Sequence, residues 1–331
     1  MKFDHNTFRQ HIFSMPANEM ATAALQLFHY QAIENTIYRQ FLELLKIHPF
    51  SIQDISQIPF LPIELYKNHR ITTGVFAPQT VFSSSGTTGT NTSYHYVADL
   101  SLYEQSFITC FERFYGSISD YVILALLPAY LEREGSSLTY MAERLIQTSL
   151  HIESGFYLYN YKDLANILQQ TTRRGQKTLL LGVTFALLDF AEHFPMSLPH
   201  TIVMETGGMK GRRPEMLRVE VHDLLCRAFE IPQIHSEYGM TELLSQAYSG
   251  GAGYFVCPPW MGIQIRDVND ALTLLPVGRA GAVNVIDLAN VHSCAFIATS
   301  DLGRCLPNGT FEILGRMDAS DRRGCNLLVA E

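Results

Sequence analysis

The sequence predicts an α/β protein in which mostly parallel sheets are covered by helices, followed by a small antiparallel β subdomain. Short apolar runs alternate with helical periods between residues 99 and 235, which is the pattern of repeated strand–helix units. After residue 250 helical periodicity disappears, and short strands between turn residues are typical of a barrel or folded sheet. We therefore expect an α/β core over residues 1–250 and a β subdomain with a short tail over residues 251–331.

The first 70 residues are predicted to be mainly helical. Apolar residues recur near helical spacing from 19 to 46, which predicts one long helix that Asn18 caps and that ends before Pro49. The run from Ile58 to Lys67 contains two prolines three positions apart. We expect it to begin extended and to become helical after Pro62.

The alternating region predicts a sheet whose ligands bind beyond the carboxyl ends of its strands. Residues 121–127 form a continuous apolar run, as expected of a strand buried on both faces. Further strands are expected at 155–158, 178–181, 201–204 and 233–235, and helices at 99–115, 137–150, 162–172, 184–193 and 214–229. In the subdomain, strands are expected at 254–256, 262–266, 272–275, 282–287 and 294–298.

Composition excludes several classes of function. A net charge of -8 without a Lys/Arg run argues against non-specific binding to nucleic acid or to an anionic membrane. The 6 cysteines form no C-x-x-C pair, so a zinc site is unsupported. Neither a signal peptide nor an apolar span of membrane length is found, so we expect a cytoplasmic protein with free thiols and no membrane span.

A Ser/Thr/Gly run is the first stretch that indicates chemistry. Every residue from Ser84 to Thr90 is Ser, Thr or Gly, and apolar or alternating residues on either side predict strand, turn and strand. Gly86 and Gly89 allow the backbone to approach a ligand closely, so that N–H groups and hydroxyls can surround phosphate oxygens. The spacing is not that of a P-loop, and a solvated surface turn is the alternative.

Two later stretches fit the same ligand. In the segment from His235 to Glu242, a turn at Tyr238 and Gly239 would present an aromatic face to a flat base, and the Glu242 carboxylate could hold a hard cation. The alternative is a polar turn entering a helix capped by Thr241. Asp301, expected at a strand end, could accept hydrogen bonds from ribose, and Arg316 could bind sugar or phosphate; ordinary hairpin turns are the alternative.

Together these stretches resemble the adenylate-forming enzymes, the superfamily of acyl-CoA synthetases. Ser84–Gly89 matches the phosphate loop, Tyr238–Glu242 the Tyr-Gly-x-Thr-Glu motif, and Gly315–Asp318 the Gly-Arg-x-Asp motif, over residues 80–318 in the family's order. Ser300 stands where the family's Gly-Asp motif has Gly. The resemblance implies ATP and Mg²⁺ as cofactors, with Glu242 as the metal ligand. The ATP-binding residues it implies are Ser84, Ser85, Gly86, Thr87, Thr88, Gly89, Thr90, Gly207, Gly208, Tyr238, Gly239, Met240, Thr241, Asp301 and Arg316.

The end of the chain departs from that superfamily. Its ordinary members continue into a mobile lid that carries a lysine, whereas this sequence stops at Glu331, so we expect no full C-terminal lid. The shortness, the Pro59–Pro62 entry and Cys325 resemble the acyl-protein synthetases of bacterial luminescence operons (LuxE-type). That resemblance implies activation of a fatty or similar apolar acid and acyl transfer to the chain's own cysteine. It also implies an acyl-accepting partner, which would be a reductase or an acyl carrier protein.

Cys325 and Lys210 are the candidate catalytic residues. Arg322 and Arg323 would lower the pKa of the Cys325 thiol, and a thiolate is the attacking species. A bystander tail cysteine and a solvated loop lysine are the alternatives. Other functions that remain open are an acyl-CoA or acyl-carrier-protein ligase of the phenylacetate–CoA ligase type, a catalytically idle scaffold, and an acyltransferase that uses preformed acyl-CoA.

Overall fold

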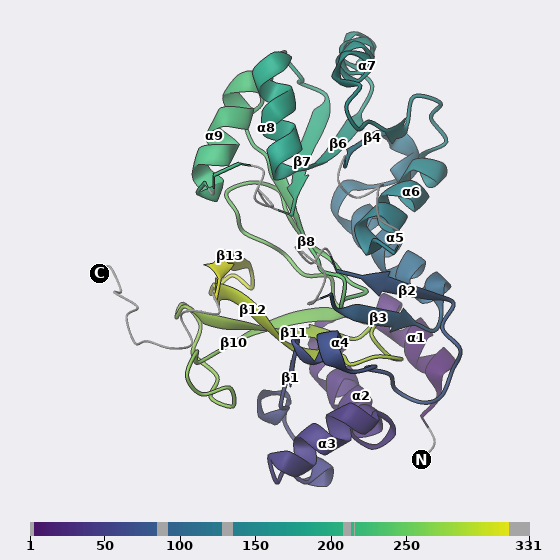
Figure 1. Ribbon diagram of the computed structural model, residues 1–331, viewed down its shortest axis with the longest axis vertical. Helices are drawn as coiled ribbons and strands as arrows, with labels where there is room; N and C mark the ends of the chain where they lie inside the picture. The colour runs from purple at the N-terminus through teal and green to yellow at the C-terminus, as the bar shows by residue number, and fades with distance from the viewer. Residues whose placement is uncertain (1–2, 85–91, 128–134, 208–212, 215, 318–331) are drawn as a thin grey trace.

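A six-stranded sheet forms the centre of the upper half of the molecule (Figure 1). The computed structural model describes residues 3–84, 92–127, 135–207, 213–214 and 216–317. The sheet order is β5-β4-β6-β7-β8-β9, where the strands are β4 (Val122–Leu126), β5 (Gly155–Phe156), β6 (Thr178–Val183), β7 (Thr201–Thr206), β8 (His235–Tyr238) and β9 (Ala247–Ser249). Strands β4 to β8 pair in parallel, and β9 pairs antiparallel with β8. Every residue of β4 and β6 is buried, as expected for parallel strands covered on both faces.

Helices cover both faces of this sheet, which confirms the predicted fold class. Figure 1 shows α8 and α9 on one side and α5 and α6 on the other. The helices are α5 (Leu100–Tyr115), α6 (Ser137–Ser149), α7 (Tyr161–Arg173), α8 (Thr184–His193) and α9 (Arg218–Phe229). The helix predicted from residue 214 begins only at Arg218, because Glu220 turns back to accept a hydrogen bond of 3.0 Å from the backbone of Leu217.

The strand predicted at 233–235 is displaced toward the motif that follows it. The β8 strand begins at His235 and includes Tyr238, because β9 pairs with it from Ser236 to Tyr238. Tyr238 is therefore in a strand and not in a turn. No helix follows: residues 239–246 form a connection without helix or strand between β8 and β9, so the alternative of a helix capped by Thr241 is wrong.

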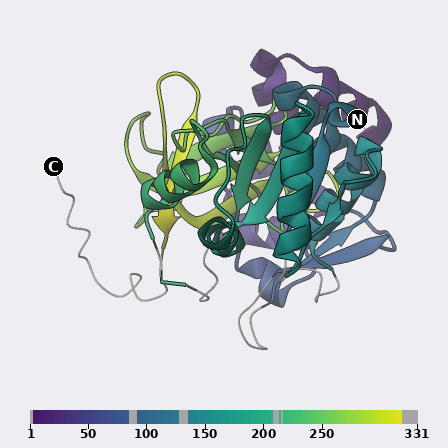
Figure 2. The ribbon, with the colours of Figure 1, turned by 90° about the horizontal axis from the view of Figure 1, so that it is seen from above.

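A second sheet combines the late part of the chain with one early strand. Its order is β1-β12-β11-β10, and β13 pairs with the later part of β12; the strands are β1 (Leu61–Pro62), β10 (Met261–Arg266), β11 (Gly281–Asp287), β12 (Phe296–Cys305) and β13 (Phe311–Arg316). The β1 strand pairs in parallel with β12, and the late strands pair antiparallel. Figure 2 shows the late strands (yellow) to one side of the helices that cover the first sheet (teal). The predicted division of the chain at residue 250 stays a prediction.

Strand boundaries in the second sheet differ from those predicted. The strands expected at 254–256 and 272–275 are reduced to isolated bridges. The strand expected at 294–298 starts at Phe296 and continues to Cys305, because β13 extends its pairing. Asp301 therefore lies within β12, opposite Arg316 of β13, and not at a strand end.

The N-terminal helices pack on the second sheet. They are α1 (His5–Ser14), α2 (Met20–Glu34), α3 (Thr36–Leu44) and α4 (Leu65–Asn68). The prediction of one helix over 19–46 is wrong, because Asn35 is extended and caps α3 with its side chain. The Asn35 amide also donates a hydrogen bond of 3.0 Å to the Ser293 carbonyl, which ties the break to the second sheet. As predicted, the chain becomes helical after Pro62, where α4 begins at Leu65.

A two-stranded hairpin, β2 (Thr80–Ser83) and β3 (Tyr94–Val97), lies beside the second sheet (Figure 1). Its antiparallel register pairs Ser83 with Tyr94. The two strands predicted on either side of the Ser/Thr/Gly run are thereby confirmed.

Candidate functional site

The hairpin brings the two ends of the Ser/Thr/Gly run together. The backbone N–H of Ser84 donates to the Ser93 carbonyl at 3.0 Å, and the Ser93 N–H donates to Ser84 Oγ at 3.0 Å. The predicted phosphate-loop residues between them, Ser85, Gly86, Thr87, Thr88, Gly89 and Thr90, lie outside the described residues. The base of that loop is therefore a closed hydrogen-bonded pair.

Glu242 lies directly against this base. The hydroxyl of Ser93 donates a hydrogen bond to Glu242 Oε1, and the carboxyl is buried, with 6% of the residue exposed. Burial raises the pKa of Glu242, while the Ser93 hydroxyl and the positive charges of Arg316 and Lys67 oppose that rise. The hairpin and the second motif, about 150 residues apart in the chain, thus meet at one carboxylate.

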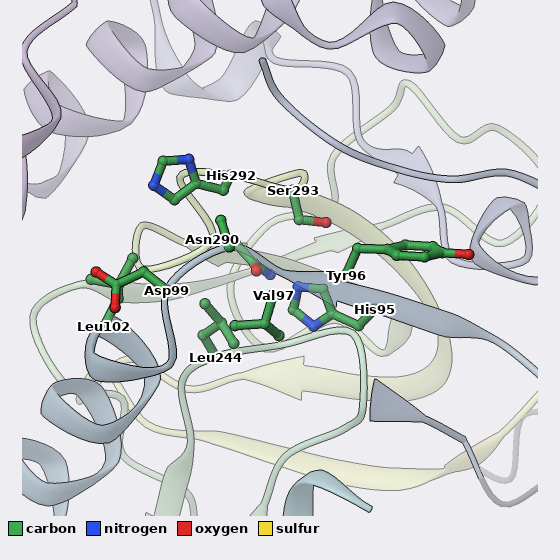
Figure 3. Close-up of a pocket in the computed structure, with 10 residues that line it drawn as sticks. His95, Tyr96, Val97, Asp99, Leu102, Leu244, Asn290, His292 and Ser293 are labelled. Carbon is green, nitrogen blue, oxygen red and sulfur yellow. The ribbon is translucent and has the colours of Figure 1, made fainter. Parts of the chain in front are cut away.

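Two side chains hold the backbone on either side of Glu242. His95 bonds the Thr241 carbonyl through Nδ1 at 2.8 Å, and the Asn290 amide donates to the Glu242 carbonyl at 2.8 Å. Figure 3 shows His95 and Asn290 side by side at a small cavity of about 10 Å³, space for roughly one water molecule. Burial lowers the pKa of His95 to about 4, so the ring is neutral at physiological pH.

A third support holds the residues that follow Glu242. The Asp287 carboxylate accepts hydrogen bonds from the backbone N–H groups of Leu244 at 2.7 Å and Ser245 at 3.1 Å. It also accepts the Ser245 hydroxyl at 2.5 Å and the Ala289 N–H at 3.1 Å. Burial raises the pKa of Asp287 to about 6, and these donors oppose the rise. The segment that carries Glu242 is consequently fixed without secondary structure of its own.

The third stretch meets the second through Asp301. The phenol of Tyr238 donates to Asp301 Oδ2 at 2.9 Å, and Arg316 Nε donates to Oδ1 at 3.0 Å. Burial, and then the Asp301 charge, raise the pKa of Tyr238, so its hydroxyl remains a donor. The Tyr238 ring packs edge-on against Phe255 and Phe311, with ring centroids 5.9 and 5.6 Å apart.

Arg316 connects the two carboxylates. Its charge acts on both Asp301 and Glu242, and both carboxylates in turn raise the pKa of Arg316. The described parts of all three predicted stretches are therefore neighbours in space: the loop base, the Glu242 segment and the Asp301–Arg316 pair.

The carboxyl ends of β7 and β8 carry three further predicted residues, Gly207, Gly239 and Met240. Gly207 follows β7 in a left-handed conformation, with φ of 78°. Gly239 and Met240 follow β8, and a Cβ atom at Gly239 would lie 2.4 Å from Glu237 Oε1, so a larger residue there would displace the end of the Glu237 side chain. Gly208, Lys210 and Cys325 lie outside the described residues.

Sequence reasoning missed the residues that support the site. His95, Asn290 and Asp287 come from three different segments, and no local motif marks them. Glu237 was also missed, although it lies inside the second stretch; its only signal was a carboxylate in a strand between two buried residues, Ser236 and Tyr238.

The donor set around Glu242 fits a magnesium ion only together with phosphate. Within the part of the chain that the structure describes, no group of three or more His, Cys, Asp or Glu side chains could hold a metal ion. Mg²⁺ commonly binds one or two carboxylates and completes its shell with phosphate oxygens and water. Glu242, beside the base of the predicted phosphate loop, can supply that single carboxylate.

Known proteins resemble this chain in fold. No protein-family model and no curated protein matches the sequence. The solved structure of ATP-bound MatB from Rhodopseudomonas palustris is 17% identical, with a TM-score of 0.55, over 71% of this chain and 47% of MatB. A 2-hydroxyisobutyryl-CoA ligase bound to 2-HIB-AMP and CoA is 13% identical in an open conformation, with a TM-score of 0.65, over 92% of this chain and 71% of the ligase.

The match to the same ligase in its thioesterification state covers 96% of this chain and 73% of the ligase, with a TM-score of 0.65. At identities this low the similarity shows the fold alone, an α/β fold in which a mostly parallel sheet is covered by helices, shared with these ligases. The chain spans about half the length of MatB. No described helix is long and apolar enough to cross a membrane.

Proposed function

We propose that this protein activates a carboxylic acid with ATP, forming an acyl-AMP, and passes the acyl group to a thiol. The observation that carries the proposal is that Glu242 bonds the base of the loop and lies within electrostatic range of the Asp301–Arg316 pair. Donors for phosphate, a carboxylate for a cation and a carboxylate–guanidinium pair for a sugar are the parts that ATP requires.

Each group has a role in this proposal. The 84–90 loop surrounds the triphosphate, Glu242 holds Mg²⁺, and Asp301 accepts hydrogen bonds from the ribose hydroxyls. Mg²⁺, when bound, offsets negative charge on the pyrophosphate leaving group. A substrate carboxylate oxygen bonds to the α-phosphorus while the bond from that phosphorus to the bridging oxygen breaks and pyrophosphate leaves. Lys210 is proposed to steady the charge at the α-phosphate.

The finer proposal is that the acid is fatty or similarly apolar and that Cys325 or a partner protein's thiol takes the acyl group. The thiolate sulfur bonds to the acyl carbon, and AMP leaves with the bonding electrons. The chain leaves the site beside Asp301, because Met317 N–H bonds the Ser300 carbonyl at 2.8 Å. Cys325 is eight positions further on. An extended segment of that length reaches at most about 29 Å, so the tether is long enough to return to the site.

The test is acid-dependent exchange of labelled pyrophosphate into ATP, combined with the intact mass of the protein after incubation with ATP, Mg²⁺ and a panel of acids. We expect exchange and an added acyl mass. In Cys325→Ser, exchange should persist and the acyl mass should disappear. Cys226→Ser, at a half-buried position of α9, is the matched control and should retain both.

Other outcomes separate the alternatives. Exchange without an acyl-protein, but with a CoA or carrier-protein thioester, would identify a ligase of the phenylacetate–CoA type. ATP binding without exchange would identify an idle scaffold. Labelling by acyl-CoA in the absence of ATP would identify an acyltransferase.

A further inference from the structure

Glu205 is a buried carboxylate near the carboxyl end of β7, where α9 packs on the sheet. It accepts hydrogen bonds from the Ser236 hydroxyl at 2.8 Å and the Thr184 hydroxyl at 2.9 Å, and 7% of the residue is exposed. Arg218 Nε lies 3.6 Å from Glu205 Oε1. Burial alone would raise the pKa of Glu205, but the His222 ring, the Arg218 charge and the two hydroxyls lower it, so the carboxylate is ionised at neutral pH.

Arg218 also reaches the second sheet. Its Nη1 donates a hydrogen bond of 3.3 Å to the carbonyl of Ile313 in β13. Its guanidinium lies over the ring of Phe255, 5.2 Å from the ring centroid. Arg218 is the first residue of α9, and Figure 1 shows α9 above β13 on the same side of the molecule. One side chain thereby connects β7 of the first sheet to β13 and to Phe255.

Both of these further contacts lead to the Asp301–Arg316 pair. The Phe255 ring packs against Tyr238, with ring centroids 5.9 Å apart, and the Tyr238 phenol bonds the Asp301 carboxylate. Ile313 lies in the same strand as Arg316, three positions before it. Arg218 therefore supports the carboxylate of the pair through one set of neighbours and the guanidinium of the pair through another.

The proposed nucleotide residues come from both sheets. Asp301 and Arg316 belong to β12 and β13, whereas Gly207 and Gly239 follow β7 and β8. A nucleotide between them is held well only when the two sheets keep a fixed separation, because hydrogen bonds weaken steeply when donor and acceptor are misplaced. A guanidinium suits this task, since its planar donors hold a fixed geometry between several partners.

We propose that Arg218 is a positioning residue for the nucleotide: its guanidinium, held by Glu205, sets the place of the Asp301–Arg316 pair relative to the first sheet and so the fit of the ribose. This inference rests on the proposed ATP-dependent activation and adds to it a residue that acts through its neighbours. Arg218 lies outside the three predicted stretches. Loss of the guanidinium should weaken selection for the ribose hydroxyls and leave the chemical step largely unchanged.

The experiment measures pyrophosphate exchange with ATP, 2′-deoxy-ATP and 3′-deoxy-ATP in the full-length protein, using the acid that gives the fastest exchange. We expect Arg218→Ala to raise the KM for ATP about fivefold, as for one lost hydrogen bond, and to leave kcat within about twofold. The preference for ATP over the deoxynucleotides should fall by a similar factor, because a displaced Asp301 no longer reaches the ribose. Arg227→Ala, at an exposed position in the last turn of α9, is the matched control and should change neither quantity.

A double-mutant cycle separates positioning from a general loss of stability. If Arg218 acts through Asp301, Arg218→Ala should add nothing to the KM for ATP in an Asp301→Ala background. Because Arg218→Ala also removes the cation beside a buried carboxylate, urea unfolding curves accompany each variant. Arg218→Lys keeps the charge beside Glu205 but lacks the planar fork that reaches the other two partners. We expect this variant to unfold like the wild-type protein and to lose part of the preference for ATP.

Failure of this inference differs from failure of the proposed function. An equal rise in KM in both backgrounds, or a wild-type preference for ATP in a folded Arg218→Lys protein, would show that Arg218 is structural only and would overturn the inference. Absence of exchange in the wild-type protein with every acid would overturn acid activation itself. In that case calorimetric titration of the same variants with ATP and 3′-deoxy-ATP, in the presence of Mg²⁺, still tests whether Arg218 positions the ribose contacts.

Discussion

Tyr238 and Asp301 are 63 positions apart, and the phenol of one donates a hydrogen bond of 2.9 Å to the carboxylate of the other. This contact joins the six-stranded sheet to the second sheet at the point where Arg316 also binds Asp301. The carboxylate thus serves both sheets and the proposed nucleotide. A carboxylate has about four lone-pair positions, so two donors from the protein leave capacity for a ligand.

Replacing Asp301 should weaken ATP binding more than it weakens the fold. We expect Asp301→Ala to raise the KM for ATP by about tenfold or more, since hydrogen bonds to a charged acceptor are lost. Tyr238→Phe removes only the protein donor and should have a smaller effect. Exchange kinetics at varied ATP concentration measure both, and an unchanged KM in Asp301→Ala would remove Asp301 from the site.

Gly239→Ala should displace the Glu237 carboxyl. The new Cβ would lie 2.4 Å from Glu237 Oε1, and overpacking of this kind costs about 1–3 kcal/mol in the free energy of unfolding. In a Glu237→Ser background the clash is absent, so the same change should cost less. Urea unfolding of the four proteins in this cycle measures the coupling, and equal costs in both backgrounds would contradict the predicted clash.

His95 should contribute a loss of stability in mild acid, which the buried carboxyls of Asp287 and Glu237 oppose because their raised pKa values favour the folded protein as the pH falls. Burial lowers the pKa of His95 to about 4 from 6.5, so between these values the unfolded chain binds a proton that the folded protein does not. The free energy of unfolding therefore decreases as the pH falls from 6.5 towards 4, by about 3 kcal/mol at most for this ring.

His95→Gln keeps a donor for the Thr241 carbonyl and should reduce that slope. Part of it will remain, because burial also lowers the pKa of His292 to about 4. His69→Gln, at an exposed position, is the control. Unfolding measured across pH 4 to 7 tests this, and an unchanged slope in His95→Gln would show that the ring is protonated in the folded state.

Asp287 should be more important for stability than its place at the end of β11 suggests. Asp287→Asn replaces one acceptor oxygen with an amide donor. That donor would face the N–H and O–H groups that bond the carboxylate in the wild-type protein. We expect a loss of about 1–3 kcal/mol in the free energy of unfolding, the cost of a buried polar group left unsatisfied. Asp270→Asn, in an exposed turn, should have a much smaller effect.

Most of the α/β core follows from local patterns in the sequence. The apolar runs at 121–127 and 178–181 and the helical period at 184–193 correspond to β4, β6 and α8. These elements are predictable because burial on both faces of a strand, or on one face of a helix, leaves a periodic trace in the chain. Where boundaries moved, pairing with another segment decided them: Asn35 bonds the distant Ser293, and β12 is extended by pairing with β13.

The residues of the candidate site also divide into those marked by local sequence patterns and those that only the fold brings together. The chain itself specified the Ser/Thr/Gly run, the Tyr238–Glu242 segment and the pair of Asp301 and Arg316, because short backbone and side-chain patterns for phosphate and cation binding are local. The tertiary structure alone decided that Ser93 meets Glu242 and that His95, Asn290 and Asp287 hold the backbone around it. The reason is physical: hydrogen bonds between segments up to 150 residues apart depend on sheet order and register, which no local pattern encodes.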